Sequence, residues 1–87
     1  MQNEKPVQTF RRGAIGGSIW LRRGRNGVFY EFSLSRCYPV GEEEFGYTNS
    51  FRQKDADDIA SVALSAADWI RRTLDNAETV MLGHDAA

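Results

Sequence analysis

The chain has 87 residues, of which 41% are hydrophobic and 26% are charged, and its formal net charge is -1. This size fits one small globular domain, and a near-neutral charge gives no overall signal for a polyanionic partner. One cysteine and one histidine exclude an internal disulfide and a His/Cys metal site. No apolar run approaches the ~20 residues that span a bilayer, and the polar N-terminus lacks the apolar core of a signal peptide. We therefore expect a cytoplasmic protein, with no membrane segment, metal or cofactor.

The first half of the chain has the pattern of β-strands. Residues 1–8 predict a flexible arm, and a strand-like stretch follows over residues 10–23, interrupted by Gly13, Gly16 and Gly17. Asn26-Gly27 is a strong signal for a two-residue hairpin turn, because both residue types tolerate positive φ. Residues 28–38 and 47–52 are rich in aromatic and β-branched side chains and predict two more strands.

The second half changes to a helical period. From Ile59 to Leu74 apolar residues recur at spacings of three and four, which is typical of an amphipathic helix. Asp55 is the expected N-cap and Asn76 the expected end, so the domain covers residues 9–76 and residues 77–87 form a tail. The expected fold is α+β: an antiparallel three- or four-stranded curved β-meander followed by one long C-terminal α-helix packed on one face. A fourth strand requires that the Gly16-Gly17 bend divides the first.

The hairpin turn assigns side chains to the two faces of the sheet. If Arg25 pairs with Val28, an apolar face forms that includes Ile19, Leu21, Tyr30, Phe32 and Leu34, and the helix should cover it. On the opposite face Trp20 lies across from Ser33 and Arg22 across from Glu31. Placing Tyr47 and Phe51 on the core side adds residues from the third strand to this second face. The candidate binding residues, on this face or at the hairpin tip, are Arg12, Ser18, Trp20, Arg22, Arg23, Arg25, Ser33, Ser35, Thr48, Ser50 and Arg52.

Charge is distributed unevenly along the chain. Residues 1–54 contain nine basic and five acidic residues, a net +4, whereas residues 55–87 contain two basic and seven acidic residues, a net -5. A basic sheet half favours an anionic partner on the sheet, and arginine suits phosphate contacts. The alternative is that the basic sheet pairs with the acidic helix of the same or a second chain. The acidic run at residues 42–44 opposes nucleic-acid binding if it lies near the same surface.

No catalytic motif is present in the sequence. The glycine-rich segment at residues 13–17 is not followed by Lys-Ser/Thr and opens no helix, so it is not a phosphate-binding loop. Cys37 has no histidine nearby in sequence, and no acid/base pair is evident. We expect a protein that is not an enzyme.

Several short strings carry a resemblance. The strings Phe10-Arg11-Arg12-Gly13-Ala14-Ile15, Ser18-Ile19-Trp20, Leu34-Ser35-Arg36-x-Tyr38, Tyr47-Thr48-Asn49-Ser50-Phe51-Arg52 and Ala67-Asp68-Trp69-Ile70 resemble a group of short, uncharacterised bacterial proteins, over about residues 10–72. In element order and face chemistry the chain also resembles the single-stranded-DNA-binding proteins of the transcriptional positive cofactor four and Whirly type. That resemblance implies a curved sheet that binds single strands and assembly through the helix side.

The expected function is sequence-tolerant binding of single-stranded DNA or RNA without catalysis. Trp20 would stack on a base, arginines would neutralise phosphates, and hydroxyls would bond to the backbone. We also expect a homodimer, because one helix on a small sheet buries little, and the residues expected at its interface are Ala63, Ala66, Trp69 and Ile70. The alternative function is a small protein–protein interaction or assembly module, in which Trp20 and the arginines contact an acidic partner.

Overall fold

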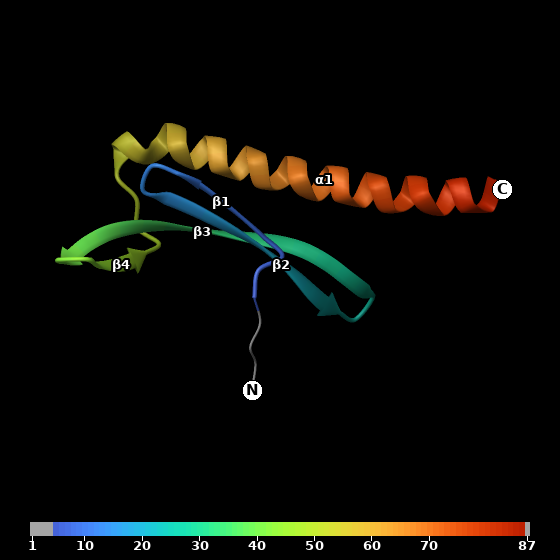
Figure 1. Ribbon diagram of the computed structural model, residues 1–87, viewed down its shortest axis with the longest axis horizontal. Helices are drawn as coiled ribbons and strands as arrows, with labels where there is room; N and C mark the ends of the chain where they lie inside the picture. Colours follow the sequence, from blue (N-terminus) through green and yellow to red (C-terminus); the bar gives the residue numbers. More distant parts are fainter. Residues whose placement is uncertain (1–4, 87) are drawn as a thin grey trace.

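The structure is a four-stranded antiparallel sheet with one long helix across one face (Figure 1). The computed structural model describes the backbone of residues 5–86 and the side chains of residues 5–77. The strands are β1 (Gln8–Arg12), β2 (Ile15–Gly24), β3 (Gly27–Gly41) and β4 (Glu44–Thr48), and they lie side by side in chain order. A short 3-10 turn, η1 (Gln53–Asp55), leads into the helix α1 (Ala56–Ala86). The predicted α+β class, a curved meander followed by one long helix, is confirmed.

The first predicted strand is in fact two strands. The chain reverses at Gly13 and Ala14, where Gly13 adopts a φ of 60°, and β1 then pairs antiparallel with β2. The fourth strand therefore exists, but the break lies at Gly13-Ala14 and not at Gly16-Gly17. Those two glycines lie within β2. A Cβ on Gly17 would be 2.6 Å from Val62 Cγ1, so the missing side chain lets α1 approach the sheet closely.

The β2–β3 hairpin has the predicted faces in a different register. Gly24 pairs with Gly27, so Arg25 and Asn26 form the loop, whereas the sequence predicted that Arg25 pairs with Val28. The positive φ falls on Gly27 (124°) and not on Asn26. This agrees with a turn that carries glycine at its fourth position. The shift is two residues, and because side chains alternate with period two, every residue keeps its predicted face.

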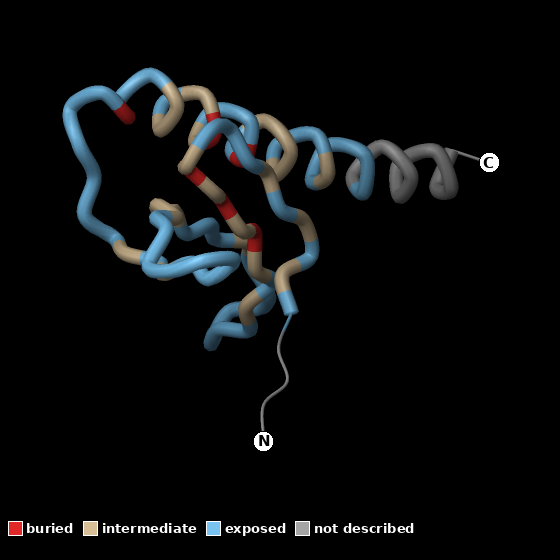
Figure 2. Tube along the Cα trace, turned by 60° about the vertical axis from the view of Figure 1, so that its left-hand side comes forward, coloured by how far each residue is buried: buried red, intermediate tan, exposed pale blue. Residues whose placement is uncertain are grey.

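The core lies between the first half of β2 and the first turns of α1. Ile15, Ile19 and Ala66 have no exposed surface and Val62 is 2% exposed. In Figure 2 the buried residues are coloured red. Tyr30 on β3 meets Trp69 on α1 edge to face, with ring centroids 5.6 Å apart. The helix lies mainly over β1 and β2 and less over β3. The hydrophobic core is therefore small and covers only part of the sheet.

The start of α1 is fixed by Asp55. The backbone N–H of Arg52 donates to Asp55 Oδ2 (3.0 Å), and the carboxylate is also 3.8 Å from Arg36 Nε. Asp55 is therefore not the N-cap that the sequence predicts: it is the third residue of η1, and its carboxylate reaches back to the N–H of Arg52, the N-cap of that turn. At the other end α1 continues past Asn76 to Ala86, so the predicted tail is largely helical. Asparagine is only mildly unfavourable in a helix, and neither proline nor glycine follows until Gly83.

The N-terminal segment partly joins the sheet. Of the predicted arm, residues 1–4 lie outside the described residues, whereas Gln8 already belongs to β1 and Val7 N–H donates to Ile19 O (2.8 Å). No described helix combines the length and the apolar character needed to cross a membrane.

Candidate nucleic-acid interface

The face of the sheet that points away from α1 is called the outer face here. It is formed by alternate residues of each strand, including Ser18, Trp20 and Arg22 of β2 and Ser33 and Ser35 of β3, as the sequence predicts. Trp20 is half-buried on this face. Its indole Nε1 donates to Ser33 Oγ (3.1 Å), and the Arg22 guanidinium lies 5.1 Å from the ring centroid. The tryptophan is thus held in a fixed orientation.

Two predicted cross-strand contacts exist despite the altered register. Arg22 Nε donates to Glu31 Oε1 at 2.7 Å, and Trp20 contacts Ser33, although Arg22 is paired with Phe29 and Trp20 with Glu31. Both contacts are therefore diagonal, which long side chains reach easily. Because Glu31 balances its charge, Arg22 contributes less to the attraction of phosphate than the sequence suggested.

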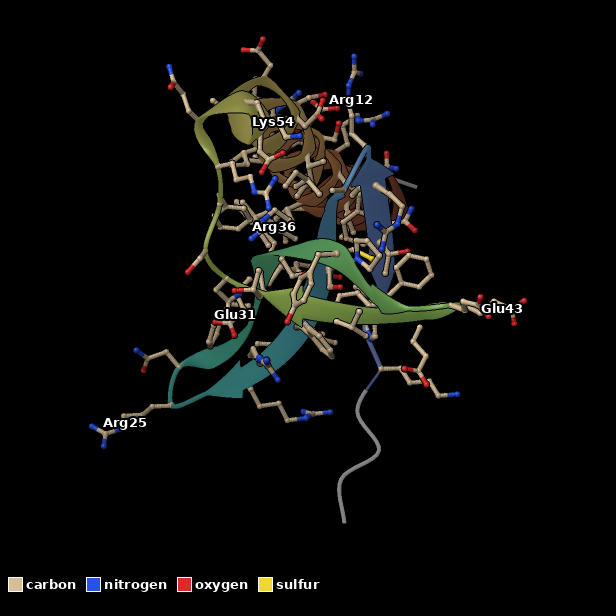
Figure 3. The ribbon with its side chains drawn as sticks, turned by 90° about the vertical axis from the view of Figure 1, so that its left-hand side faces the viewer. Arg12, Arg25, Glu31, Arg36, Glu43 and Lys54 are labelled. Carbon is tan, nitrogen blue, oxygen red and sulfur yellow. The ribbon has the colours of Figure 1, made fainter. Side chains whose placement is uncertain are left out.

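Arg12 is not on the outer face, contrary to the prediction. It pairs with Ile15, which places it on the side of α1, where its Nε is 3.4 Å from Asp58 Oδ1 (Figure 3). The prediction treated residues 10–23 as one strand, and the reversal at Gly13 and Ala14 changes the alternation. The neighbouring Arg11, paired with Gly16, takes the outer position instead.

The predictions for β4 and the segment after it are also reversed. Tyr47 pairs with Cys37 on the outer face and is 63% exposed, whereas Thr48 pairs with Arg36 on the opposite side. The reason is that so short a strand contains no independent signal for its own register. Ser50 and Arg52 follow β4 in the connection to α1, and Phe51 is exposed rather than buried.

Thr48 and Arg52 meet a different set of residues. Together with Arg36, Tyr38 and Pro39 they line an open cavity of about 430 Å³. Arg36 Nε donates to Ser50 O (2.9 Å), and its guanidinium lies 5.7 Å from the Tyr38 ring centroid. This basic cavity is separate from the outer-face residues that surround Trp20.

A second hollow lies on the outer face itself, with a volume of about 280 Å³. Its floor includes the backbone of Gly16 and Gly17, and its sides include Arg11 and Tyr47. The remaining lining residues are Thr9, Phe10, Ser18 and Ser35. Sequence reasoning missed Thr9, Arg11 and Tyr47. Reading Gly13-Ala14 as a turn would have placed Thr9 and Arg11 on this face.

The two ends of the sheet carry opposite charges. Arg23 and Arg25 are exposed near the β2–β3 turn, whereas Glu42 and Glu43 form the β3–β4 turn and Glu44 begins β4. Arg25 and Glu43 lie at different ends of the sheet in Figure 3. The acidic run is therefore remote from the basic hairpin tip.

The residues predicted at a dimer interface lie largely against the sheet of their own chain. Ala66 is fully buried, Trp69 packs on Tyr30, and Ala63 and Ile70 are partly buried. Among the described residues, no group of three or more His, Cys, Asp or Glu is placed to hold a metal ion. Comparison with known proteins gives no match, whether to a protein-family model, to a curated protein or to a solved structure.

Proposed function

We propose that the outer face of the sheet binds single-stranded nucleic acid, with little sequence preference and without catalysis. The observation that carries this proposal is the hollow of about 280 Å³ between Arg11 and Tyr47, with glycine backbone as its floor. It combines a cation, an exposed ring and hydroxyl groups on one surface. These are the groups with which proteins hold an unpaired nucleotide.

Each part of the hollow has a separate chemical role. Arg11 Nη2 is 3.3 Å from the position that a Cβ on Gly16 would occupy, so the guanidinium extends over the bare backbone at the edge of the floor. There it would neutralise a phosphate. Tyr47, 63% exposed, offers a ring on which a base would stack, an interaction worth ~1–3 kcal/mol. Hydroxyls of Ser18 and Ser35 accept or donate hydrogen bonds and so discriminate little between bases.

Further aromatic side chains extend this surface beyond the hollow. Trp20 follows along β2, and Phe29 of β3 is 48% exposed on the same face. Phe45 of β4 is 59% exposed and pairs with Pro39. A face that keeps several large rings in water has the character of a contact surface. A single strand can use these rings, whereas the bases of an intact duplex stay stacked.

The test is a titration of a fluorescently labelled oligothymidine with protein, read by anisotropy. Arg11→Ala should weaken binding by about tenfold and lower the salt slope by ~0.7, because one phosphate contact is lost. Arg12→Ala is the matched control, since Arg12 is the adjacent residue on the opposite face and should leave affinity within about twofold. Tyr47→Ala should also weaken binding by about tenfold.

The results separate this function from its alternative. No binding of the oligonucleotide at low salt, where electrostatic attraction is strongest, contradicts the proposal. Equal effects of Arg11→Ala and Arg12→Ala contradict the site even if binding occurs. The alternative function, a protein-interaction module, is favoured by one observation: large apolar side chains such as Leu64 (70% exposed) and Leu74 (53%) remain in water on α1.

A further inference from the structure

Part of β3 lacks a strand neighbour on one side. β3 has 15 residues and pairs with β2 through residues 27–36, whereas β4 pairs only with residues 36–41. Along residues 27–35 no described strand lies on the side opposite β2. The first part of β3, the longest of the described strands, is therefore an open sheet edge.

The direction of the backbone groups along this edge follows from two hydrogen bonds. Cys37 N–H donates to Ala14 O, next to β2, whereas Leu34 O accepts from Asn49 Nδ2 (2.9 Å) on the other side. Because backbone groups alternate in direction along a strand, the even-numbered residues point away from β2. Val28, Tyr30 and Phe32 thus present N–H and C=O groups to the open side, and Asn49 occupies the next position.

The side chains of this edge are mostly apolar. Val28 is 57% exposed, Phe29 48% and Phe32 39%. Natural proteins usually protect an open edge with lysine, proline, a bulge or a very short strand. Residues 28–34 contain no lysine or proline, and the irregularity of β3 lies at Pro39 and Gly41. Their one charged side chain, Glu31, is on the outer face, where Arg22 pairs with it. Such an edge is a template for pairing with another strand.

We propose that a second copy of this chain pairs with this edge, antiparallel, to form one continuous eight-stranded sheet. Asn49 limits the partner strand, because it already contacts Leu34 O. The longest antiparallel self-pairing that stops before Leu34 covers residues 27–33 and is centred on Tyr30. In this register Arg25 and Asn26, the loop of the second copy, come to the place where Asn49 ends the edge. The open edge of one copy and the matching strand of the second copy therefore have the same length.

This register also places apolar side chains opposite apolar side chains. Tyr30 faces its own counterpart and Val28 faces the counterpart of Phe32, so apolar groups on the α1 side cover each other, with about six new backbone hydrogen bonds. A register shifted by one residue in each chain places Glu31 opposite Glu31, which is unfavourable. It also pairs Val28 with Leu34, whose carbonyl Asn49 occupies. The pairing centred on Tyr30 is therefore preferred.

The first experiment is sedimentation of the wild-type chain at micromolar concentrations, combined with amide hydrogen exchange resolved by residue. We expect a dimer in which the amides of Val28, Tyr30 and Phe32 exchange at least tenfold more slowly than in diluted, monomeric protein. The amides of the odd-numbered residues, which point toward β2, should be protected in both states. A monomer at these concentrations, or a dimer whose Tyr30 and Phe32 amides stay unprotected, overturns the proposal.

A matched pair of variants tests the same edge. Val28→Lys should weaken the dimer at least tenfold, since it places a charge on both sides of a two-fold pairing. Val40→Lys is the control: Val40 is on the same strand and is 56% exposed, but it lies in the segment beside β4. Equal dimerisation of both folded variants, checked by circular dichroism, contradicts the interface. The oligonucleotide titration is independent of this result, so dimerisation and nucleic-acid binding can fail separately.

Discussion

Gly16 and Gly17 are neighbours in β2 whose missing side chains serve opposite faces of the sheet. A Cβ on Gly17 would meet Val62 Cγ1 at 2.6 Å and Leu34 Cδ2 at 3.3 Å, in the packed layer under α1. Val62 is itself buried and has little room to move. On the other face, a Cβ on Gly16 would meet Arg11 Nη2 at 3.3 Å, the far end of a flexible side chain.

This contrast predicts different outcomes for two similar substitutions. Gly17→Ala should lower the free energy of unfolding by about 1–3 kcal/mol, because the added methyl group overpacks the core. Gly16→Ala should change it by less than about 0.5 kcal/mol and instead narrow the hollow on the outer face. Urea denaturation of both variants checks this. Equal destabilisation by the two substitutions would show that the packing of α1 on β2 is not as close as described.

Individual faces were predictable where the turn chemistry was clear. The assignment of Trp20, Ser33 and Arg22 to one face needed only the alternation of strand residues and a hairpin near Asn26. This assignment is correct although the predicted register was wrong, because the two registers differ by two residues and a shift by an even number keeps each side chain on its face. The face predicted for Arg12 was wrong because the turn at Gly13 and Ala14, which changes the alternation, was not recognised. The face predicted for Tyr47 was wrong because a strand as short as β4 has too few residues to show which of them face the core.

At the scale of elements, the junction between the sheet and α1 depends on one acidic residue. Asp55 is 6% exposed, accepts the N–H of Arg52 and lies 3.8 Å from Arg36 Nε. The Arg36 side chain is 16% exposed and projects from β3 toward the segment that carries Lys54 (Figure 3). The carboxylate therefore both closes the 3-10 turn that leads into α1 and balances a charge that is mostly removed from water.

Asp55→Ala is accordingly expected to lower the free energy of unfolding by about 2–3 kcal/mol, from the lost hydrogen bond to Arg52 N–H and the unbalanced guanidinium. Asp57→Ala is the control, because Asp57 is exposed in the first turn of α1 and contributes only ~0.5 kcal/mol through the helix dipole. Thermal unfolding followed by circular dichroism measures both. A loss from Asp55→Ala no larger than that from Asp57→Ala would contradict this role.

The elements themselves were more predictable than their ends. The change from strand pattern to helical period near residue 55 gave the order of elements, and Asp55 marked the junction. The end of α1 was not predictable from Asn76, because a helix of alanine, leucine and charged residues tolerates one asparagine. The open edge of β3 was not predictable either, since it depends on how few residues of β3 are covered by β4.

For the whole molecule, a small core and an open sheet edge together predict that stability depends on concentration. Within the described residues the buried hydrophobic side chains are Ile15, Ile19, Val62 and Ala66. If the dimer forms through β3, each tenfold increase in protein concentration should raise Tm by about 2–4 °C, because dilution favours the dissociated state. Scanning calorimetry over a hundredfold concentration range checks this. Val28→Lys should remove the dependence, and a Tm independent of concentration in the wild-type chain would contradict it.

The opposite charges at the two ends of β3 have a consequence for the rate of encounter with a polyanion. At long distances only the net charge of -1 acts on a polyanion, so there is no long-range attraction. Closer than the ~8 Å screening length of physiological salt, a polyanion meets either the arginines of the β2–β3 turn or the glutamates of the β3–β4 turn. Only the orientations in which the polyanion meets the arginines then lead to binding. Association should therefore proceed at an ordinary rate of about 10⁵–10⁶ M⁻¹s⁻¹ without electrostatic steering, and salt should act mainly by speeding release.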